Sequence, residues 1–194
     1  MRMQNKVALI TGAGSGIGRA TALRLSEEGA RIACVDAMAD AASDTARAIT
    51  AAGGDAIALA VDVTDEAACA RMVEEALARF GRLTSLVNSA GVRSDPPDPM
   101  PESREWRRVV DVNLTGSYLV SRATLSALTA SGAASITNLA SIFGLVGGST
   151  SSAYAASKGA IVNLTRQMAL EFAPAVRVNC VPGCDRNADD GITA

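Results

Sequence analysis

The stretch Thr11-Gly12-Ala13-Gly14-Ser15-Gly16-Ile17-Gly18 decides the fold, because it joins an apolar run to an amphipathic one. The run before it, Val7-Ala8-Leu9-Ile10, is short and branched enough to be a buried strand. The residues after it predict a helix whose stripe holds Ile17, Ala20, Thr21 and Leu25. A strand that enters a glycine-rich turn and leaves it as a helix is typical of a phosphate-binding site.

Each of three glycines in this turn has a physical reason to be glycine. Gly12 permits a tight turn, Gly16 lets the backbone approach a pyrophosphate, and Gly18 lets the helix pack closely on the strand. The N–H groups where the helix begins would bind the phosphates together with the helix dipole. The spacing Gly-x3-Gly-x-Gly differs from the common dinucleotide fingerprint, and glycine turns also occur without a ligand.

Asp36 extends this interpretation from phosphates to an adenosine ribose. It follows the apolar run Ile32-Ala33-Cys34-Val35, the next expected strand, and lies 24 residues after Gly12. An acidic residue at the end of the second strand accepts both ribose hydroxyls and repels a 2′-phosphate. The alternative is an ordinary strand-end carboxylate in water. The pattern favours NAD over NADP.

Length and composition favour one domain with an aliphatic core. The chain has 194 residues, of which 48% are hydrophobic and 3% aromatic, as expected for helices packed on a sheet. A net charge of −2 without a basic cluster argues against nucleic acid or an anionic membrane as partner. No apolar stretch approaches the roughly 20 residues of a membrane span. Residues 1–3 could pass for the start of a signal peptide, but the apolar stretch after them is too short and runs into glycines, so secretion is not expected. We expect a cytoplasmic protein.

Histidine is absent from the chain, which excludes Ser-His-Asp hydrolysis, Cys-His chemistry and histidine-ligated zinc. The four cysteines, at 34, 69, 180 and 184, show no metal-ligand spacing, so no metal is expected and reduced thiols are the plain interpretation. Proton transfer must therefore use a carboxylate, tyrosine, lysine or cysteine.

Strand-like and helix-like segments alternate along the whole chain, which predicts a single α/β Rossmann domain over residues 1–183, with a doubly wound parallel sheet and helices on both faces. Residues 184–194 form an atypical tail. Strands are expected near 6–11, 31–36, 56–61, 83–88, 133–139 and 175–180. Helices are expected near 16–28, 40–51, 65–79, 102–130 (with a break near Asp111) and 152–172.

Tyr154 and Lys158 lie four residues apart early in the last of these helices, on one face and one turn apart. An ammonium beside a phenol favours the phenolate and lowers the tyrosine pKa from its ordinary value of about 10. Tyr154 is then a candidate general acid for a carbonyl and general base for an alcohol. Taken alone, such a pair also arises by chance on helix surfaces.

Ser141 and Asn113 are two further polar residues that could act together with Tyr154 and Lys158. Ser141 follows the strand expected at 133–139, at the end where ligands bind in open parallel sheets, and its hydroxyl is suited to polarise a substrate oxygen. Asn113 lies inside a long expected helix, where asparagine is mildly unfavourable. Asn113 either lies at a kink of the helix, where its side chain or backbone holds a water, or it is a buried amide whose hydrogen bonds are all made within the protein.

Together these residues resemble the classical short-chain dehydrogenase/reductase family, and the resemblance runs from residue 6 to about 183. Thr11 to Gly18 matches its nucleotide turn, which has the pattern Thr-Gly-x3-Gly-x-Gly. Asp62-Val63 matches its adenine-contact pair. Asn88-Ser89-Ala90-Gly91 matches its Asn-Asn-Ala-Gly segment, with serine in place of the second asparagine. Its catalytic tetrad is matched by Asn113, Ser141, Tyr154 and Lys158.

The resemblance implies an oxidoreductase that transfers a hydride between NAD(H) and a secondary alcohol or ketone. It implies that Tyr154 is the general acid and base and that Ser141 holds the substrate oxygen. It also implies that Lys158 binds the nicotinamide ribose and that Asn113 anchors a proton-relay water. The implied cofactor contacts are Gly12, Ser15, Gly16, Ile17, Gly18, Asp36, Asp62, Val63, Asn88, Ala90, Gly91, Tyr154, Lys158, Pro182 and Gly183.

Cofactor preference, substrate contacts and assembly follow from the same resemblance. Ser15 and Ala37 occupy the two places where this family tends to carry a cation for NADP, which again favours NAD. In this family the substrate contacts the loop around 93–101, residues after Ser141 and a segment beyond Gly183. Among the residues after Ser141, Phe143 and Leu145, with Val146 beside them, suggest a partly apolar pocket or else pack helices. Members of the family commonly pair the helices expected at 102–130 and 152–172, so a homodimer or homotetramer is expected.

Two other classes of function use a similar sheet. A nucleotide-binding protein that kept the fold and lost turnover would differ from an enzyme by binding NADH without acting on any alcohol. A methyltransferase also has a glycine turn and an acidic strand end, but it has no use for Ser141, Tyr154 and Lys158 in this order.

After Gly183 the family pattern breaks. Members continue with a segment like Val-Ile-Glu-Thr-Pro-Met-Thr, whereas this chain has Cys184 to Gly191. One permissible coding of these residues, shifted by one base, reads Val-Ile-Glu-Thr-Pro-Met-Thr-Ala. We interpret this as a frameshift near Pro182 that removes a seventh strand and the substrate-covering helices. It predicts weak or no turnover and a poorly ordered tail after Gly183. The nucleotide sequence across codons 178–194 decides the matter, since a shifted frame without such a segment would refute it.

Overall fold

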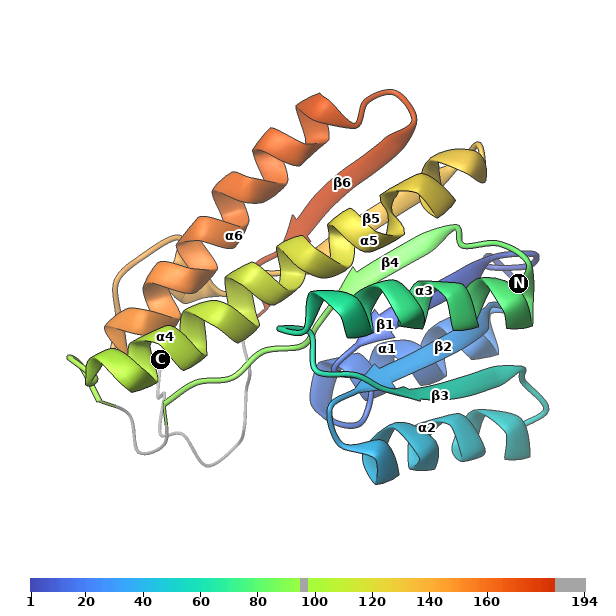
Figure 1. Ribbon diagram of the computed structural model, residues 1–194, viewed down its shortest axis with the longest axis horizontal. Helices are drawn as coiled ribbons and strands as arrows, with labels where there is room; N and C mark the ends of the chain where they lie inside the picture. The colour runs from blue at the N-terminus through green and yellow to red at the C-terminus, as the bar shows by residue number, and fades with distance from the viewer. Residues whose placement is uncertain (95–97, 184–194) are drawn as a thin grey trace.

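The computed structural model describes residues 1–94 and 98–183 and contains a six-stranded parallel sheet (Figure 1). The sheet order is β3-β2-β1-β4-β5-β6, so the strand order reverses between β1 and β4. Ligands of open α/β sheets bind at such a switch point, beside the carboxyl ends of the strands. The strands are β1 (Val7–Thr11), β2 (Arg31–Asp36), β3 (Ala56–Ala60), β4 (Ser85–Asn88), β5 (Ala134–Leu139) and β6 (Val176–Val181).

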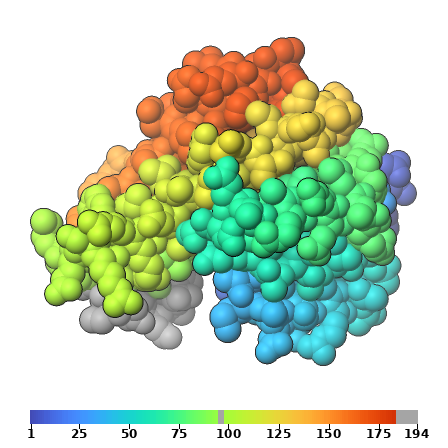
Figure 2. All heavy atoms as spheres, in the orientation of Figure 1, coloured from blue at the N-terminus to red at the C-terminus, as the bar shows by residue number. Residues whose placement is uncertain are grey.

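Helices cover the sheet from both sides, which confirms the predicted doubly wound fold. Helices α1 (Gly16–Glu27) and α2 (Ala39–Ala51) pack on one face. The other face carries α3 (Glu66–Phe80), α4 (Ser103–Val110), α5 (Ser117–Ala130) and α6 (Ser152–Glu171). Figure 2 shows the side chains of α3, α5 and α6 as a continuous layer over this second face.

The predicted elements agree with the observed ones to within about two residues at each end. The interruption expected near Asp111 is a π-helical turn over Asp111–Gly116, which joins α4 to α5. The apolar stripe predicted for α1 is wrong: its buried residues are Gly18 and Ala22, while Ile17 is 38% exposed. The close fit of Gly18 against the turn sets this rotation of the helix.

Two predictions fall on residues outside the described ranges. These are the nature of the tail at 184–194 and the conformation of positions 95–97 in the loop before α4. Among the helices that the structure describes, none is both long enough and apolar enough to cross a membrane.

Candidate active site

A cavity of about 450 Å³ lies at the carboxyl ends of the strands, where the sheet order reverses. It gathers segments far apart in the chain, namely the glycine turn, the ends of β2 to β5 and the start of α6. Most of the predicted site residues line it. These are Gly12, Ser15, Gly16, Ile17, Gly18, Asp36, Asp62, Val63, Ala90, Gly91, Tyr154, Lys158 and Gly183.

The glycine turn is shaped by contacts that leave no room for side chains. A Cβ on Gly18 would lie 2.1 Å from the carbonyl oxygen of Gly12, so the helix start sits directly on the turn. Gly12 itself has a φ of +65°, and its Cβ would lie 2.9 Å from the backbone of Ala90. Gly16 differs, because a Cβ there would meet nothing within 4 Å. The space above Gly16 is therefore open to a ligand that approaches the backbone.

The N-terminus of α1 is suited to an anion. Ser15 is the N-cap residue, but its side chain does not cap the helix, and the first turn holds no acidic residue. The N–H groups at the helix start thus lack the side-chain acceptors that often satisfy them. Because these residues line the cavity, the helix dipole and its N–H donors are directed at the cavity.

The Asp36 carboxylate is fixed by two backbone donors. Gly14 N donates to Asp36 Oδ2 at 2.9 Å, and Met38 N donates to Asp36 Oδ1 at 3.0 Å. Gly14 must be glycine, since a Cβ would lie 2.9 Å from Asp36 Oδ2 and 2.5 Å from the Ala41 Cβ. Each carboxylate oxygen keeps a further lone pair for a ligand hydroxyl. The turn and the acidic residue are therefore one connected unit.

Thr11 connects the glycine turn to the segment after β4, a role that the sequence did not reveal. Its side chain is buried, and its Oγ1 accepts hydrogen bonds from Ser89 N and Ala90 N, both at 3.1 Å. Ser89 lines the cavity together with Ala90. A β-branched hydroxyl at the end of a central strand, directly before a glycine turn, is the signal that predicts such a link.

Asn88 does not line the cavity, although it was predicted to contact the cofactor. Its buried side chain turns toward α5 and β5, where Nδ2 donates to Ser121 Oγ and to Asn138 Oδ1, both at 2.9 Å. Asn138 Nδ2 in turn donates to Thr165 Oγ1 at 2.9 Å. This network joins β4, β5, α5 and α6 beneath the cavity. Asn88 therefore positions the strand ends instead of facing the cavity.

Asn113 lies in the π-helical turn, and its side chain is only 1% exposed. Its Oδ1 accepts from Val92 N at 2.7 Å, while Nδ2 donates to Val92 O at 2.9 Å and to Ser157 Oγ at 3.0 Å. Its backbone carbonyl accepts from Ser117 Oγ at 2.8 Å. The side-chain amide is thus satisfied within the protein, and the π-helical turn is the kink that the first alternative expected at this position.

Ser157 completes a connection from this turn to α6. It donates from Oγ to the carbonyl oxygen of Tyr154 at 2.8 Å, and it is 1% exposed. Asn113 therefore reaches Tyr154 through one hydroxyl group. Because this hydroxyl is buried, the position of the first turn of α6 is tied to the π-helical turn and to the loop at Val92.

Lys158 and Tyr154 both line the cavity, with the ammonium 5.7 Å from the centre of the Tyr154 ring. Lys158 is 5% exposed, and its Nζ donates to the carbonyl oxygen of Leu139 at 2.7 Å. That carbonyl belongs to the last residue of β5, so the strand end fixes the ammonium. A buried cation is thus held next to a phenol that faces the same cavity.

Ser141 is buried and does not line the cavity, although its neighbour Ala140 does. Its Oγ accepts from Phe143 N at 3.3 Å and caps a short 3₁₀ turn, Ile142–Gly144, which the sequence did not predict. Leu145 and Val146 are more than half exposed. Neither they nor Phe143 line the cavity, and Phe143 instead packs on Gly148.

The buried cysteines lie away from this chemistry. Burial raises the pKa of the Cys34 thiol to about 12 and that of Cys69 to about 11, so both stay protonated at neutral pH. In the part of the chain that the structure describes, no group of three or more cysteine or acidic side chains is placed to hold a metal ion.

Comparison with known proteins places this chain among dehydrogenases. The short chain dehydrogenase family model matches residues 6–185. Cis-4-hydroxycyclohexanecarboxylate dehydrogenase from Sinomonas cyclohexanicum is 43% identical over 182 residues, covering 92% of this chain and 72% of that enzyme. Cyclohexanol dehydrogenase from Acinetobacter sp. is 40% identical over 185 residues, covering 94% and 74%. A crystal structure described as NAD⁺-bound xylitol dehydrogenase has a TM-score of 0.88 at 36% identity, covering 93% and 70%.

The fold and the cavity thus define a nucleotide-binding α/β domain of dehydrogenase type. The chain belongs to the short chain dehydrogenase family, whose members named above are oxidoreductases.

Proposed function

We propose that this protein is an NAD-dependent oxidoreductase that interconverts a secondary alcohol and a ketone, with Tyr154 as the general acid and base. The observation that carries this proposal is the single cavity that holds the glycine turn, Asp36, Tyr154 and Lys158. A dinucleotide and a proton-transfer group would then meet at the switch point of one sheet.

The residues present fit a nicotinamide dinucleotide. The open space at Gly16 and the uncapped start of α1 suit a pyrophosphate, and the fixed carboxylate of Asp36 suits a ribose diol. Asp62 and Val63 border the cavity where an adenine would follow, and Lys158 would hold the nicotinamide ribose. When bound, the nicotinamide would take or give a hydride at the carbinol carbon.

Side chains of the protein would transfer the proton of the substrate hydroxyl. The buried ammonium of Lys158, 5.7 Å from the centre of the Tyr154 ring, would stabilise a phenolate on Tyr154, which would then take the proton of a substrate hydroxyl. Ser141 would hold the substrate oxygen with its O–H, because its Oγ only accepts from Phe143 N and keeps its own hydrogen to donate. Asn113 acts by position, since its side chain clamps Val92 and reaches Tyr154 through Ser157.

The relatives support an alicyclic alcohol as the substrate class. Two of the enzymes that this chain resembles at 40% identity or more are named for hydroxylated cyclohexane rings. We therefore choose cyclohexanol as the first substrate for activity measurements. A protein that binds NADH but leaves every secondary alcohol of a panel unchanged would instead be a nucleotide-binding member without turnover.

Asp36 should make NADH bind at least about tenfold more tightly than NADPH, because a 2′-phosphate beside a fixed carboxylate is repelled. Fluorescence titration of the two cofactors measures the ratio. The double variant Asp36→Ala/Ala37→Arg should reverse the preference. Asp44→Ala, which removes an exposed aspartate outside the cavity, is the matched control and should leave the ratio unchanged. Equal affinity of the unaltered protein for both cofactors would contradict the proposed role of Asp36.

Exposed apolar side chains support the proposed self-association through α4, α5 and α6. Trp106 is 40% exposed, Tyr118 45% and Leu170 78%, and they lie on these three helices. Light scattering at micromolar concentration should give at least a dimer, and Tyr118→Glu should shift it toward the monomer because a charge would be buried at the contact. A strict monomer would count against the proposal. A dimer that persists when a charged residue is introduced on each of the three helices would also count against it.

A further inference from the structure

A second hollow, of about 430 Å³, lies at the opposite edge of the sheet, where the strands begin. The residues that line it are Gln4, Asn5, Lys6, Gly29, Arg31 and Arg82. Three of these side chains are cations, two are amides, and none is a carboxylate. The dehydrogenase cavity lies at the carboxyl ends of the same strands, so the two sites share no lining residue.

The topology brings the three cations together. Lys6 directly precedes β1, Arg31 is the first residue of β2, and Arg82 precedes β4. These strands are neighbours in the order β2-β1-β4, and Arg31 N donates to the carbonyl oxygen of Lys6 at 3.0 Å. Because parallel strands begin at the same end of the sheet, the residue at or before the start of each of these strands places one positive charge in the same hollow.

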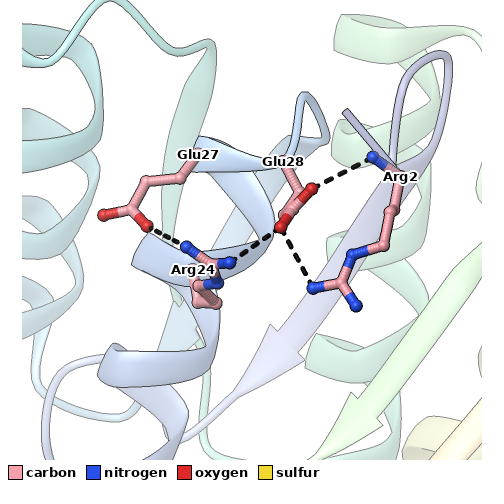
Figure 3. Close-up of polar contacts among 4 residues, drawn as sticks. All are labelled: Arg2, Arg24, Glu27 and Glu28. Atoms are coloured by element: carbon pink, nitrogen blue, oxygen red, sulfur yellow. Dashed lines mark hydrogen bonds and ion pairs between the residues drawn. The ribbon is translucent and has the colours of Figure 1, made fainter.

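Two carboxylates near the hollow form ion pairs with arginines outside it. Figure 3 shows Glu28, next to Gly29 in the chain, between the guanidinium groups of Arg2 and Arg24. Glu28 accepts from Arg2 at 3.0 Å and from Arg24 at 2.8 Å, and the contact with Arg2 lowers its pKa to about 2. Asp55 is paired with Arg79. Neither carboxylate is therefore available to neutralise the hollow.

Arg31 is held in place by an aromatic ring. Its guanidinium lies 5.4 Å from the ring centre of Phe80, which is 4% exposed. Arg79 lies 4.9 Å from the same centre. A guanidinium stacked on a ring keeps its N–H edges free for an anion and loses little freedom on binding. The hollow is therefore partly organised before any ligand arrives.

We propose that this hollow binds the phosphate chain of a small oligophosphate, either free or as part of a nucleotide. Three cations and two amides present many donors, and a phosphate chain supplies several charged acceptor oxygens within a small volume. The chain as a whole carries a net charge of −2, so this cation cluster is a local feature and not a consequence of overall charge. The site is independent of the proposed oxidoreductase function.

Calorimetric titration with inorganic tripolyphosphate, and separately with ATP, tests the proposal on the full chain. The double variant Lys6→Gln/Arg82→Gln should bind both ligands about tenfold more weakly at low salt, because two charge-assisted contacts are lost. Arg31 is left intact because its ring contact contributes to packing. The matched control Arg47→Gln/Arg122→Gln removes the same charge from helices α2 and α5 and should bind both ligands as tightly as the unaltered protein.

Several results would overturn the proposal. Undiminished binding in Lys6→Gln/Arg82→Gln would place the ligand elsewhere, for example at the glycine turn. An equal loss in the control would show a nonspecific effect of net charge, and no binding to the unaltered protein at low salt would refute the site directly. Thermal unfolding of each variant, expected to match the unaltered protein within a few degrees, excludes a folding defect as the cause.

Discussion

Tyr154→Phe is expected to lower the turnover of a secondary alcohol by about a thousandfold, within the range that general acid–base groups contribute. The change removes only the hydroxyl, so the ring keeps its place beside Lys158 and the cavity keeps its shape. NADH should therefore bind the variant with nearly unchanged affinity. Steady-state kinetics and NADH fluorescence titration measure the two quantities on the same sample.

Tyr118→Phe is the matched control for this experiment, because the chain has only two tyrosines. Tyr118 lies on α5, is 45% exposed and does not line the cavity. Its variant should keep full activity. If Tyr154→Phe were as active as the unaltered protein, Tyr154 would not be the proton-transfer group and the proposed mechanism would be wrong.

Lys158→Met should damage both cofactor binding and the chemical step. The ammonium would hold the nicotinamide ribose and stabilise the phenolate, whereas methionine keeps most of the buried volume and supplies neither effect. We expect NADH to bind on the order of tenfold more weakly and turnover to fall by about a hundredfold or more. The loss in turnover should persist at saturating cofactor, which separates the chemical role from the binding role.

A structural effect of this change must be measured separately. Leu139, which lines the cavity, loses a hydrogen bond from a charged donor to its carbonyl oxygen, a contribution of about 1.5–3 kcal/mol. Thermal unfolding gives its size. Lys6→Met removes the chain's only other lysine, at the far edge of the sheet, and should leave turnover unchanged. Normal turnover in Lys158→Met at saturating NAD would contradict the proposed support of Tyr154.

The sequence predicted the sheet well because its signals are local. Apolar runs of strand length follow the glycines that end helices, and Gly29, Gly53, Gly81 and Gly132 all have the positive φ expected at such helix ends. The break near Asp111 was predictable from Asn113, which is unfavourable within a helix. These features depend on residues close together in the chain, and that is why one sequence suffices to find them.

The errors concern the directions of side chains, which tertiary packing determines. The α1 stripe was misplaced because Gly18, and not an apolar side chain, fits closely against the turn at Gly12 and sets the rotation of the helix. Asn88 follows the expected motif, yet its amide turns toward Ser121 and Asn138 on elements that lie far along the chain. The link through Ser157 was missed for the same reason, since its partner Asn113 lies 44 residues away.

The central claim is that the cavity at the carboxyl ends of the strands oxidises a secondary alcohol with NAD and uses Tyr154 to take the proton. The measurement that tests it most directly is the formation of NADH fluorescence from NAD⁺ and cyclohexanol or a related cyclic alcohol, with Tyr154→Phe run alongside. The account predicts slow but measurable NADH formation by the unaltered protein, in line with the weak turnover expected from the sequence, and almost none by Tyr154→Phe. Equal rates in both proteins, or no NADH from any secondary alcohol of the panel, would contradict it.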